Sequence, residues 1–228
     1  MRLKLIILFI YSALVLPAIA APEFTSLTEA LKNPTAVKSL NLSGKGLTAL
    51  PETIGKLTNL EKLNLSTNKL TALPKGLFTL KKLKNLNLAA NKLTSIPASI
   101  ANLKNLEELD LGFNQLKSIP KEIGSLSKLK RFVASKNSLS SLPDEIKGAS
   151  AIEIVDLTYN QFTSIPPQLT TLTNLKTIDI SFNKTLDAFP SEIKNLTALK
   201  LLNLKNTKIS AKQVDDMTWL IPNCKVLL

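Results

Sequence analysis

The sequence predicts an α/β solenoid, a curved and horseshoe-like stack of about eight short repeats with a parallel sheet on its concave side. The first observation is a proline every 23 residues, with one final step of 24: Pro51, Pro74, Pro97, Pro120, Pro143, Pro166 and Pro190. The second is an asparagine with the same spacing: Asn68, Asn91, Asn114, Asn137, Asn160 and Asn183. The third is a short alternation of apolar and polar residues before each asparagine. A period of this length indicates units that pack only against their neighbours.

Each unit begins with a short predicted strand. In the row "LEKLNLSTNKLTALPKGLFTL", Leu60 to Leu80, the inward residues Leu63 and Leu65 flank the outward residue Asn64. The segment after each proline is too short for a full α-helix. We expect it to be extended or to form one 3₁₀-like turn on the opposite side of the unit.

The sequence resembles the leucine-rich repeat proteins of the 23-residue type from Val37 to Ile209, with rows of the form L-x-x-L-x-L-x-x-N-x-L. It is similar to small exported members of bacteria, notably spirochaetes, in its beginning "SLTEALKNPTAVKSLNLSGKGLTALPETIGKL". The resemblance implies that the six spaced asparagines point inward and form a ladder of bonds to the backbone of neighbouring repeats. A buried amide without partners costs about 1–3 kcal/mol, so such bonds are also physically required.

Residues 1–20 are expected to be a secretory signal peptide and not part of the fold. Arg2 and Lys4 precede the apolar run "LIILFIYSALVLP", and small residues end at Ala20. The run is short and interrupted by proline, which argues against a membrane span. We therefore expect an exported protein that is secreted, periplasmic or on the cell surface.

Short helical caps are expected at both ends of the repeats, which span residues 37–209. In the N-terminal cap, residues 21–36, Ser26 and Glu29 match a capping box at the start of a short helix. A second capping box opens the C-terminal cap, residues 210–228, whose final "CKVLL" predicts a last strand. Solenoids need such covers because their terminal repeats have a neighbour on only one side.

Repeat five is irregular, because Phe132 and Ala134 replace the usual inward leucines and Ala149 replaces the leucine before the next row. We expect these changes in volume to compensate one another. The 24-residue step predicts a bulge after Asn183.

The composition excludes several kinds of chemistry. The chain has no histidine, which removes the commonest general base and a common transition-metal ligand. Its one cysteine, Cys224, allows no disulfide within the chain and is expected to be a small buried group. The net charge is +12, or +10 without residues 1–20, and the lysines are scattered. We expect no cofactor and no metal.

A third hypothesis is that the protein is an enzyme. The acids Glu108 and Asp110, or Glu153 and Asp156, are pairs of the kind that cleave glycans, but each pair would lie on an open, shallow sheet. No phosphate-binding glycine loop or metal-ligand cluster accompanies them.

The expected binding surface lies on the concave face of repeats four to seven. Large side chains precede the asparagine in consecutive rows there: Phe113, Lys136, Tyr159 and Phe182. The corresponding residues of the first three rows, Gly44, Thr67 and Ala90, are small. Outward strand positions beside the large residues add charged and aliphatic groups: Glu108, Asp110, Arg131, Val133, Asp156 and Asp179. Rigid aromatics beside charges are typical of interaction hot spots, although aromatics before this asparagine can also serve the scaffold.

The leading hypothesis is a non-catalytic protein that binds another protein through this surface, at the cell envelope or at a host interface. The alternative is an anionic polysaccharide or glycosaminoglycan, attracted by the basic surface. Nucleic acid is not expected as a partner, because acids flank the aromatics. We expect a monomer.

Overall fold

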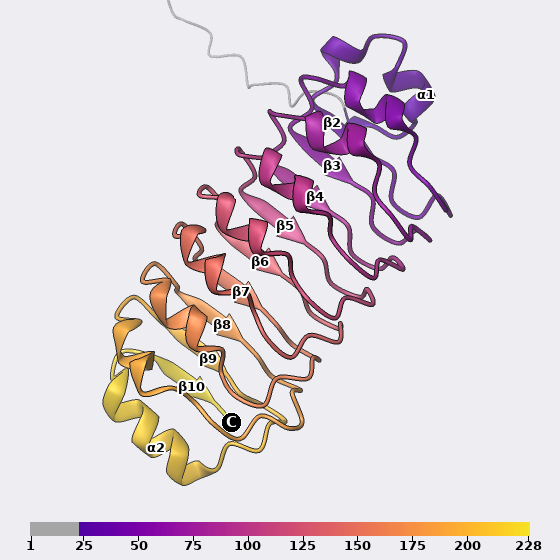
Figure 1. The fold of residues 1–228 in the computed structure, drawn as a ribbon. Coiled ribbons are helices and arrows are strands. Elements are labelled where there is room, and N and C mark those ends of the chain that lie inside the picture. The colour runs from indigo at the N-terminus through magenta and orange to yellow at the C-terminus, as the bar shows by residue number, and fades with distance from the viewer. Residues whose placement is uncertain (1–22) are drawn as a thin grey trace, which may run out of the picture.

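The computed structural model describes residues 23–228, and the predicted signal peptide lies outside them (Figure 1). Within this range, ten short strands form one parallel sheet in chain order. They are β1 (Glu23–Phe24), β2 (Ser39–Asn41), β3 (Lys62–Asn64), β4 (Asn85–Asn87), β5 (Glu108–Asp110), β6 (Arg131–Val133), β7 (Ile154–Asp156), β8 (Thr177–Asp179), β9 (Leu201–Asn203) and β10 (Lys225–Leu227). Equivalent residues of neighbouring repeats pair in register, as Leu63 pairs with Leu86. Each strand therefore lies beside the previous one with the same residues facing inward.

The opposite side of the solenoid consists of short 3₁₀ turns, as expected for segments too short for a helix. They are η1 (Pro34–Ala36), η2 (Glu52–Lys56), η3 (Lys75–Thr79), η4 (Ala98–Asn102), η5 (Lys121–Ser125), η6 (Asp144–Gly148), η7 (Pro167–Thr171) and η8 (Ser191–Asn195). The regularly spaced prolines stand immediately before η2 to η8. The carbonyl of Pro51, for example, accepts a hydrogen bond from the N–H of Ile54 at 3.1 Å. The fixed φ of proline therefore sets the start of each turn.

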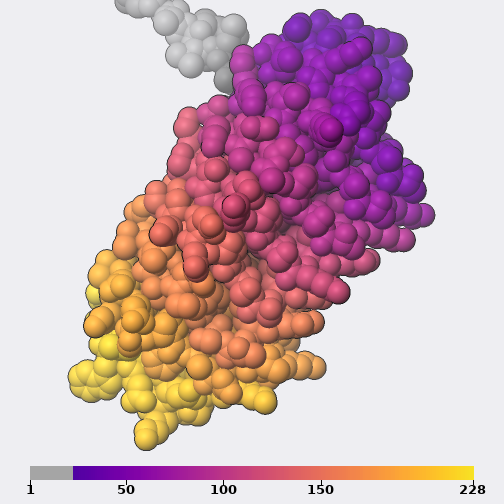
Figure 2. Space-filling view, viewed as in Figure 1, coloured from indigo at the N-terminus to yellow at the C-terminus, as the bar shows by residue number. Residues whose placement is uncertain are grey.

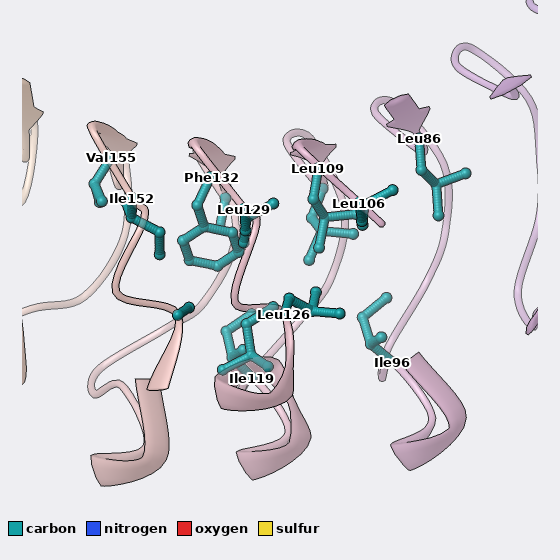
Figure 3. Packing of buried hydrophobic residues seen from close by; sticks show 14 of the residues in the cluster. Leu86, Ile96, Leu106, Leu109, Ile119, Leu126, Leu129, Phe132, Ile152 and Val155 are labelled. Carbon is teal, nitrogen blue, oxygen red and sulfur yellow. The ribbon is translucent and has the colours of Figure 1, made fainter. Parts of the chain in front are cut away.

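Aliphatic side chains fill the space between the strands and the turns. Figure 3 shows leucines, isoleucines and Phe132 from consecutive repeats pointing into one continuous core. Phe132, Ala134 and Ala149 are all completely buried, and Phe132 pairs in register between Leu109 and Val155. The larger and smaller side chains of repeat five are thus accommodated without a break in the sheet. In Figure 2 the colours follow one another along the molecule, because each repeat contacts only its neighbours in sequence.

The six spaced asparagines join consecutive repeats through the same set of hydrogen bonds. The Asn91 amide nitrogen donates to the carbonyl oxygens of Leu65 and Leu88, both at 3.0 Å. Its oxygen accepts from the N–H of Leu70 at 3.0 Å. In the last row Thr207 stands in this position, and its hydroxyl donates to the Leu204 carbonyl at 2.7 Å. The buried amides are satisfied by backbone, as physical chemistry requires.

Helical caps cover both ends of the solenoid. At the N-terminal end α1 (Leu27–Ala30) is the predicted short helix, but its capping box is only half formed. The Ser26 hydroxyl accepts from the N–H of Glu29, but the Glu29 carboxylate pairs with Lys32 at 2.8 Å and does not return to the cap.

The C-terminal cap consists of α2 (Ala211–Leu220) and β10. Here both bonds of the capping box between Ser210 and Gln213 are present. Strand β10, as predicted from "CKVLL", extends the sheet beside β9. Cys224 is half-buried, and burial raises the pKa of its thiol to about 11, which keeps it protonated and unreactive at neutral pH.

The 24-residue step is accommodated by a tight turn after Asn183. The Asn183 carbonyl accepts from the N–H of Leu186 at 3.0 Å, and the Thr185 hydroxyl donates to the carbonyl of Phe162 in the preceding row. The bulge therefore forms where the sequence predicted it. No helix of residues 23–228 is both long enough and apolar enough to cross a membrane.

Candidate functional site

The residues before the ladder asparagines share a left-handed backbone conformation that the sequence reasoning missed. Their φ angles are positive in every row: Gly44 (66°), Thr67 (56°), Ala90 (54°), Phe113 (54°), Lys136 (49°), Tyr159 (53°), Phe182 (59°) and Asn206 (57°). Glycine and asparagine are the residues that adopt this conformation most readily, and they stand at the two ends of the column. Gly44 and Asn206 were the residues from which the left-handed conformation could have been predicted.

Phe113, Lys136, Tyr159 and Phe182 form one continuous stack on the surface, here called the aromatic stripe. The Lys136 ammonium lies between two rings, 4.4 Å from the centroid of Phe113 and 4.8 Å from that of Tyr159. Tyr159 then stacks on Phe182 with centroids 4.1 Å apart and planes inclined by 8°. Each exposed cation–π contact is worth about 0.5–1 kcal/mol, so the four side chains hold one another in place. Phe113 and Tyr159 nevertheless remain 53% and 44% exposed.

The predicted aspartates of the strands have a structural task. The Asp110 carboxylate accepts a hydrogen bond from the N–H of Gly112 at 2.9 Å, and Asp156 and Asp179 make the same bond two residues on, at 3.0 and 3.1 Å. Asparagines make this bond in the other rows: Asn41, Asn64, Asn87 and Asn203. Such Asx turns explain why the column is restricted to Asp and Asn in all rows but one. Burial raises the pKa of the Asp110 carboxyl above its ordinary value, although the N–H of Gly112 and the charge of Arg131 act in the opposite direction.

Val133 does not match its predicted role as an exposed aliphatic contact. It is only 5% exposed, yet it lies outside the apolar core of the solenoid. Its neighbours in register are Asp110 and Asp156, about 4.8 Å away on either side. With 5% of its surface exposed, Val133 offers a partner little surface.

Glu108 and Arg131 are exposed and face each other in register, but the hollow they border extends toward the N-terminus. This hollow of about 240 Å³ lies over β1 to β6 and is lined by strand residues such as Lys62, Asn64 and Asn87, with Glu108, Asp110 and Arg131 at its end. The structure thus divides the predicted residues between two places. The aromatic stripe runs past the strand ends of repeats four to seven, and the hollow occupies the strands before it.

A row of alternating charge was not anticipated from the sequence. The second residue of each row is, in order, Lys38, Glu61, Lys84, Glu107, Lys130, Glu153, Lys176 and Lys200. Ion pairs link neighbouring rows: Lys84–Glu61 at 2.7 Å, Lys130–Glu107 at 2.8 Å and Lys176–Glu153 at 2.7 Å. The hydrogen bond from the paired lysine lowers the pKa of Glu61 and of Glu107. Part of the positive charge is therefore already compensated within the protein.

Members of both carboxylate pairs considered for catalysis already bond within the protein, and Asp110 holds its own turn. Glu153 is paired with Lys176, and Asp156 holds its own turn. Within residues 23–228 no cluster of three or more His, Cys, Asp or Glu side chains is arranged to hold a metal ion.

Comparison with known proteins agrees with this architecture. Residues 25–137 match a family model described as a leucine-rich repeat region, and residues 150–209 match a second, described as a leucine rich repeat. No curated protein matches the chain.

Solved structures include bacterial and plant relatives. A leucine-rich repeat protein of Leptospira interrogans is 33% identical with a TM-score of 0.73, and the match covers 90% of this chain but 58% of that one. The plant peptide hormone receptor RGFR1, in complex with RGF2, is 33% identical with a TM-score of 0.70, covering 85% of this chain and 32% of that one. Internalin C2 of Listeria monocytogenes is 25% identical with a TM-score of 0.73, covering 86% and 82%. With its repeats, its asparagine ladder and these matches, the chain belongs to the leucine-rich repeat family and is similar to bacterial members of it.

Proposed function

We propose that this chain is a non-catalytic, exported protein that binds another protein through the aromatic stripe and the adjacent concave face, at the cell envelope or at a host interface. The observation that carries the proposal is the stripe itself. Its four side chains are ordered by mutual stacking, and two of its rings remain about half exposed.

Preorganisation is the physical advantage of this arrangement. Ordering a mobile side chain at an interface costs about 0.5–1.5 kcal/mol, and this cost is reduced when the side chain is already held. Exposed aromatics of this kind are enriched among the residues that dominate binding energy. The solenoid adds a rigid sheet beside them, which suits an extended partner segment.

Two further observations support the proposal. Solved relatives include the plant peptide hormone receptor RGFR1 in complex with RGF2, so a protein of related fold serves in recognition elsewhere. The basic, apolar and small residues at the start of the chain support export.

The test is capture of a partner by the mature protein, residues 21–228, from bacterial envelope fractions and from host extracellular fractions. In the comparison variant Phe113, Tyr159 and Phe182 are all changed to Ala, a residue that already adopts the left-handed conformation at Ala90. We expect this triple variant to lose the partner, with at least a tenfold weaker Kd once the partner is purified.

The matched control is Trp219→Ala, because Trp219 is an aromatic residue 86% exposed on α2, away from the stripe. It should retain the partner in full. Equal retention by the triple variant would contradict the proposal. Capture only on heparin resin, lost at moderate salt by all proteins alike, would favour the anionic-glycan alternative instead.

A further inference from the structure

The aromatic stripe ends abruptly at Phe113. One face of the Phe113 ring is covered by the Lys136 ammonium. The preceding residues of the column, Ala90 and Thr67, carry side chains too small to cover the other face. Phe113 is accordingly the most exposed ring of the stripe, at 53%.

The spacing of the rows fits one further ring at this place. Consecutive strands of a sheet lie about 4.8 Å apart. Tyr159 and Phe182, from consecutive rows, stack with centroids 4.1 Å apart. A planar group at the row of Ala90 would therefore meet Phe113 at the stacking distance already present further along the stripe.

The surface beside this place offers hydrogen-bond donors. Asn64 and Asn87 use their side-chain oxygens to hold the N–H groups of Ser66 and Ala89. In the described part of the chain their amide nitrogens are neither bonded to protein groups nor buried without a partner, so they are open to a ligand. Both residues also line the hollow over β1 to β6.

Charge indicates what kind of group fits. The Lys136 ammonium already occupies the far face of Phe113, so a second cation on the same ring would meet repulsion. The hollow is lined by the carboxylates of Glu23, Glu108 and Asp110 and by the cations of Lys62 and Arg131, so it has no excess of positive charge to attract a phosphate or sulfate. A neutral aromatic ring meets neither objection, and stacked aromatic pairs contribute about 0.5–1.5 kcal/mol beyond the area they bury.

We propose that the open face of Phe113 receives one aromatic side chain of the partner protein, which lies over Ala90 while the adjoining partner backbone bonds to Asn64 and Asn87. The partner segment then runs over repeats two to four, N-terminal to most of the stripe, and the stripe acts as a stacked support for Phe113. This inference rests on the proposed function and names the chemistry of its partner.

The test fills the space beside the open face of Phe113 with a side chain of this protein. Ala90→Phe puts a ring where the partner's ring is expected, and its backbone is tolerable because Phe113 and Phe182 already adopt φ of 54° and 59°. The matched control is Asn206→Phe, which extends the stack at its other end, beside Phe182, at the same kind of left-handed position.

The first readout is the binding of N-acetyl-tyrosinamide as the probe, monitored by NMR of the ¹⁵N-labelled protein. We expect saturable shifts at the amides of Asn87, Ala90 and Phe113 with a Kd of about millimolar size, as befits so small a ligand. Ala90→Phe should abolish them and Asn206→Phe should leave them. Shifts that survive in Ala90→Phe, or that are as large with N-acetyl-argininamide or N-acetyl-leucinamide, would overturn the inference.

The second readout separates this inference from the proposed function. Ala90→Phe should weaken binding of the captured partner at least tenfold, while Asn206→Phe should not. If the triple stripe variant loses the partner but Ala90→Phe keeps it, the stripe binds and the Phe113 inference is wrong. If tyrosinamide binds as expected but the triple variant keeps the partner, Phe113 accepts a ring, but the proposed function and the assignment of that ring to the partner are both wrong.

Discussion

A single backbone conformation determines which residues serve well in the column of the stripe. Left-handed φ costs a residue with a Cβ roughly 1–2 kcal/mol, and glycine pays nothing for it. Lysine, tyrosine and phenylalanine stand there nonetheless, in four consecutive rows. Their mutual stacking offsets part of this strain, which the repeat itself imposes, because Thr67 and Ala90 share the conformation outside the stripe.

Ala90→Gly is expected to stabilise the protein by about 0.5–1 kcal/mol, because the relief of left-handed strain exceeds the extra entropy that glycine loses on folding. Ala89→Gly is the matched control. Ala89 is similarly half-buried and is not among the described residues with positive φ, so it should lose about 0.5–1 kcal/mol. Urea denaturation measures both, and equal effects of the two substitutions would contradict the assignment of strain.

Asp110→Asn is expected to stabilise the protein at neutral pH, because asparagine keeps the acceptor for the N–H of Gly112, as Asn87 does in its own row. Burial raises the pKa of Asp110, so the folded protein holds this proton more tightly than the unfolded chain. Ionisation therefore weakens the fold at neutral pH, and this penalty disappears as the pH falls through the folded pKa to below the unfolded one.

Urea midpoints at pH 7 and at pH 3 measure this effect. The variant should exceed the native protein at pH 7 and match it more nearly at pH 3. A variant that is less stable at pH 7 would show that the attraction of Arg131 outweighs burial.

At the scale of elements, glycine brings neighbouring 3₁₀ turns together. A Cβ added to Gly124 in η5 would overlap the backbone carbonyl of Glu145 in η6, and one added to Gly148 would overlap that of Gly124. The equivalent position of η4 holds Ala101, so this close approach belongs to particular pairs of turns. The spacing on the turn side of the solenoid therefore varies along its length, while the sheet keeps its register.

Gly124→Ala is expected to destabilise the protein by about 1–3 kcal/mol, because the added methyl group must push two backbones apart. Ala101→Gly serves as the control at the equivalent position and should lose no more than about 1 kcal/mol through backbone entropy. Thermal and urea denaturation measure both variants. A Gly124→Ala variant as stable as the native protein would mean that the turns separate freely.

At the scale of the whole molecule, the fold could be predicted because one sequence pattern recurs in about eight consecutive rows. The spacing of prolines and asparagines and the apolar alternation predict the strands and turns in every row, and the caps are predicted separately from their capping boxes. The candidate site was harder to predict. Asp156 and Asp179 stay predicted partner contacts, but the bond that each makes to its own turn could not be predicted from an outward strand position. The sequence predicts an exposed Val133, but its exposed fraction is only 5%, because exposure depends on the surrounding rows and not on strand position alone.

From the sequence, the side chains of the stripe could be predicted to lie near one another, but not to stack. The sequence placed Phe113, Lys136, Tyr159 and Phe182 in consecutive rows, but not the insertion of an ammonium between two rings. The hollow over β1 to β6 was unforeseen as well, because its shape depends on side chains from several rows together. A hollow depends on the sizes of side chains in neighbouring rows, which no single row reveals.

The row of alternating lysine and glutamate gives this solenoid a longer unit than its 23-residue repeat. Loss of the row that holds Glu107 alone would bring Lys84 against Lys130, two like charges on adjacent strands. Loss of the two rows that hold Glu107 and Lys130 would instead place Lys84 beside Glu153, a pair of opposite sign. The alternation runs from Lys38 to Lys176 and ends there, since Lys176 and Lys200 follow each other with like charge. Within the alternating rows the molecule can therefore lose repeats without bringing like charges together only in steps of two, so the building block there is a pair of opposite sign.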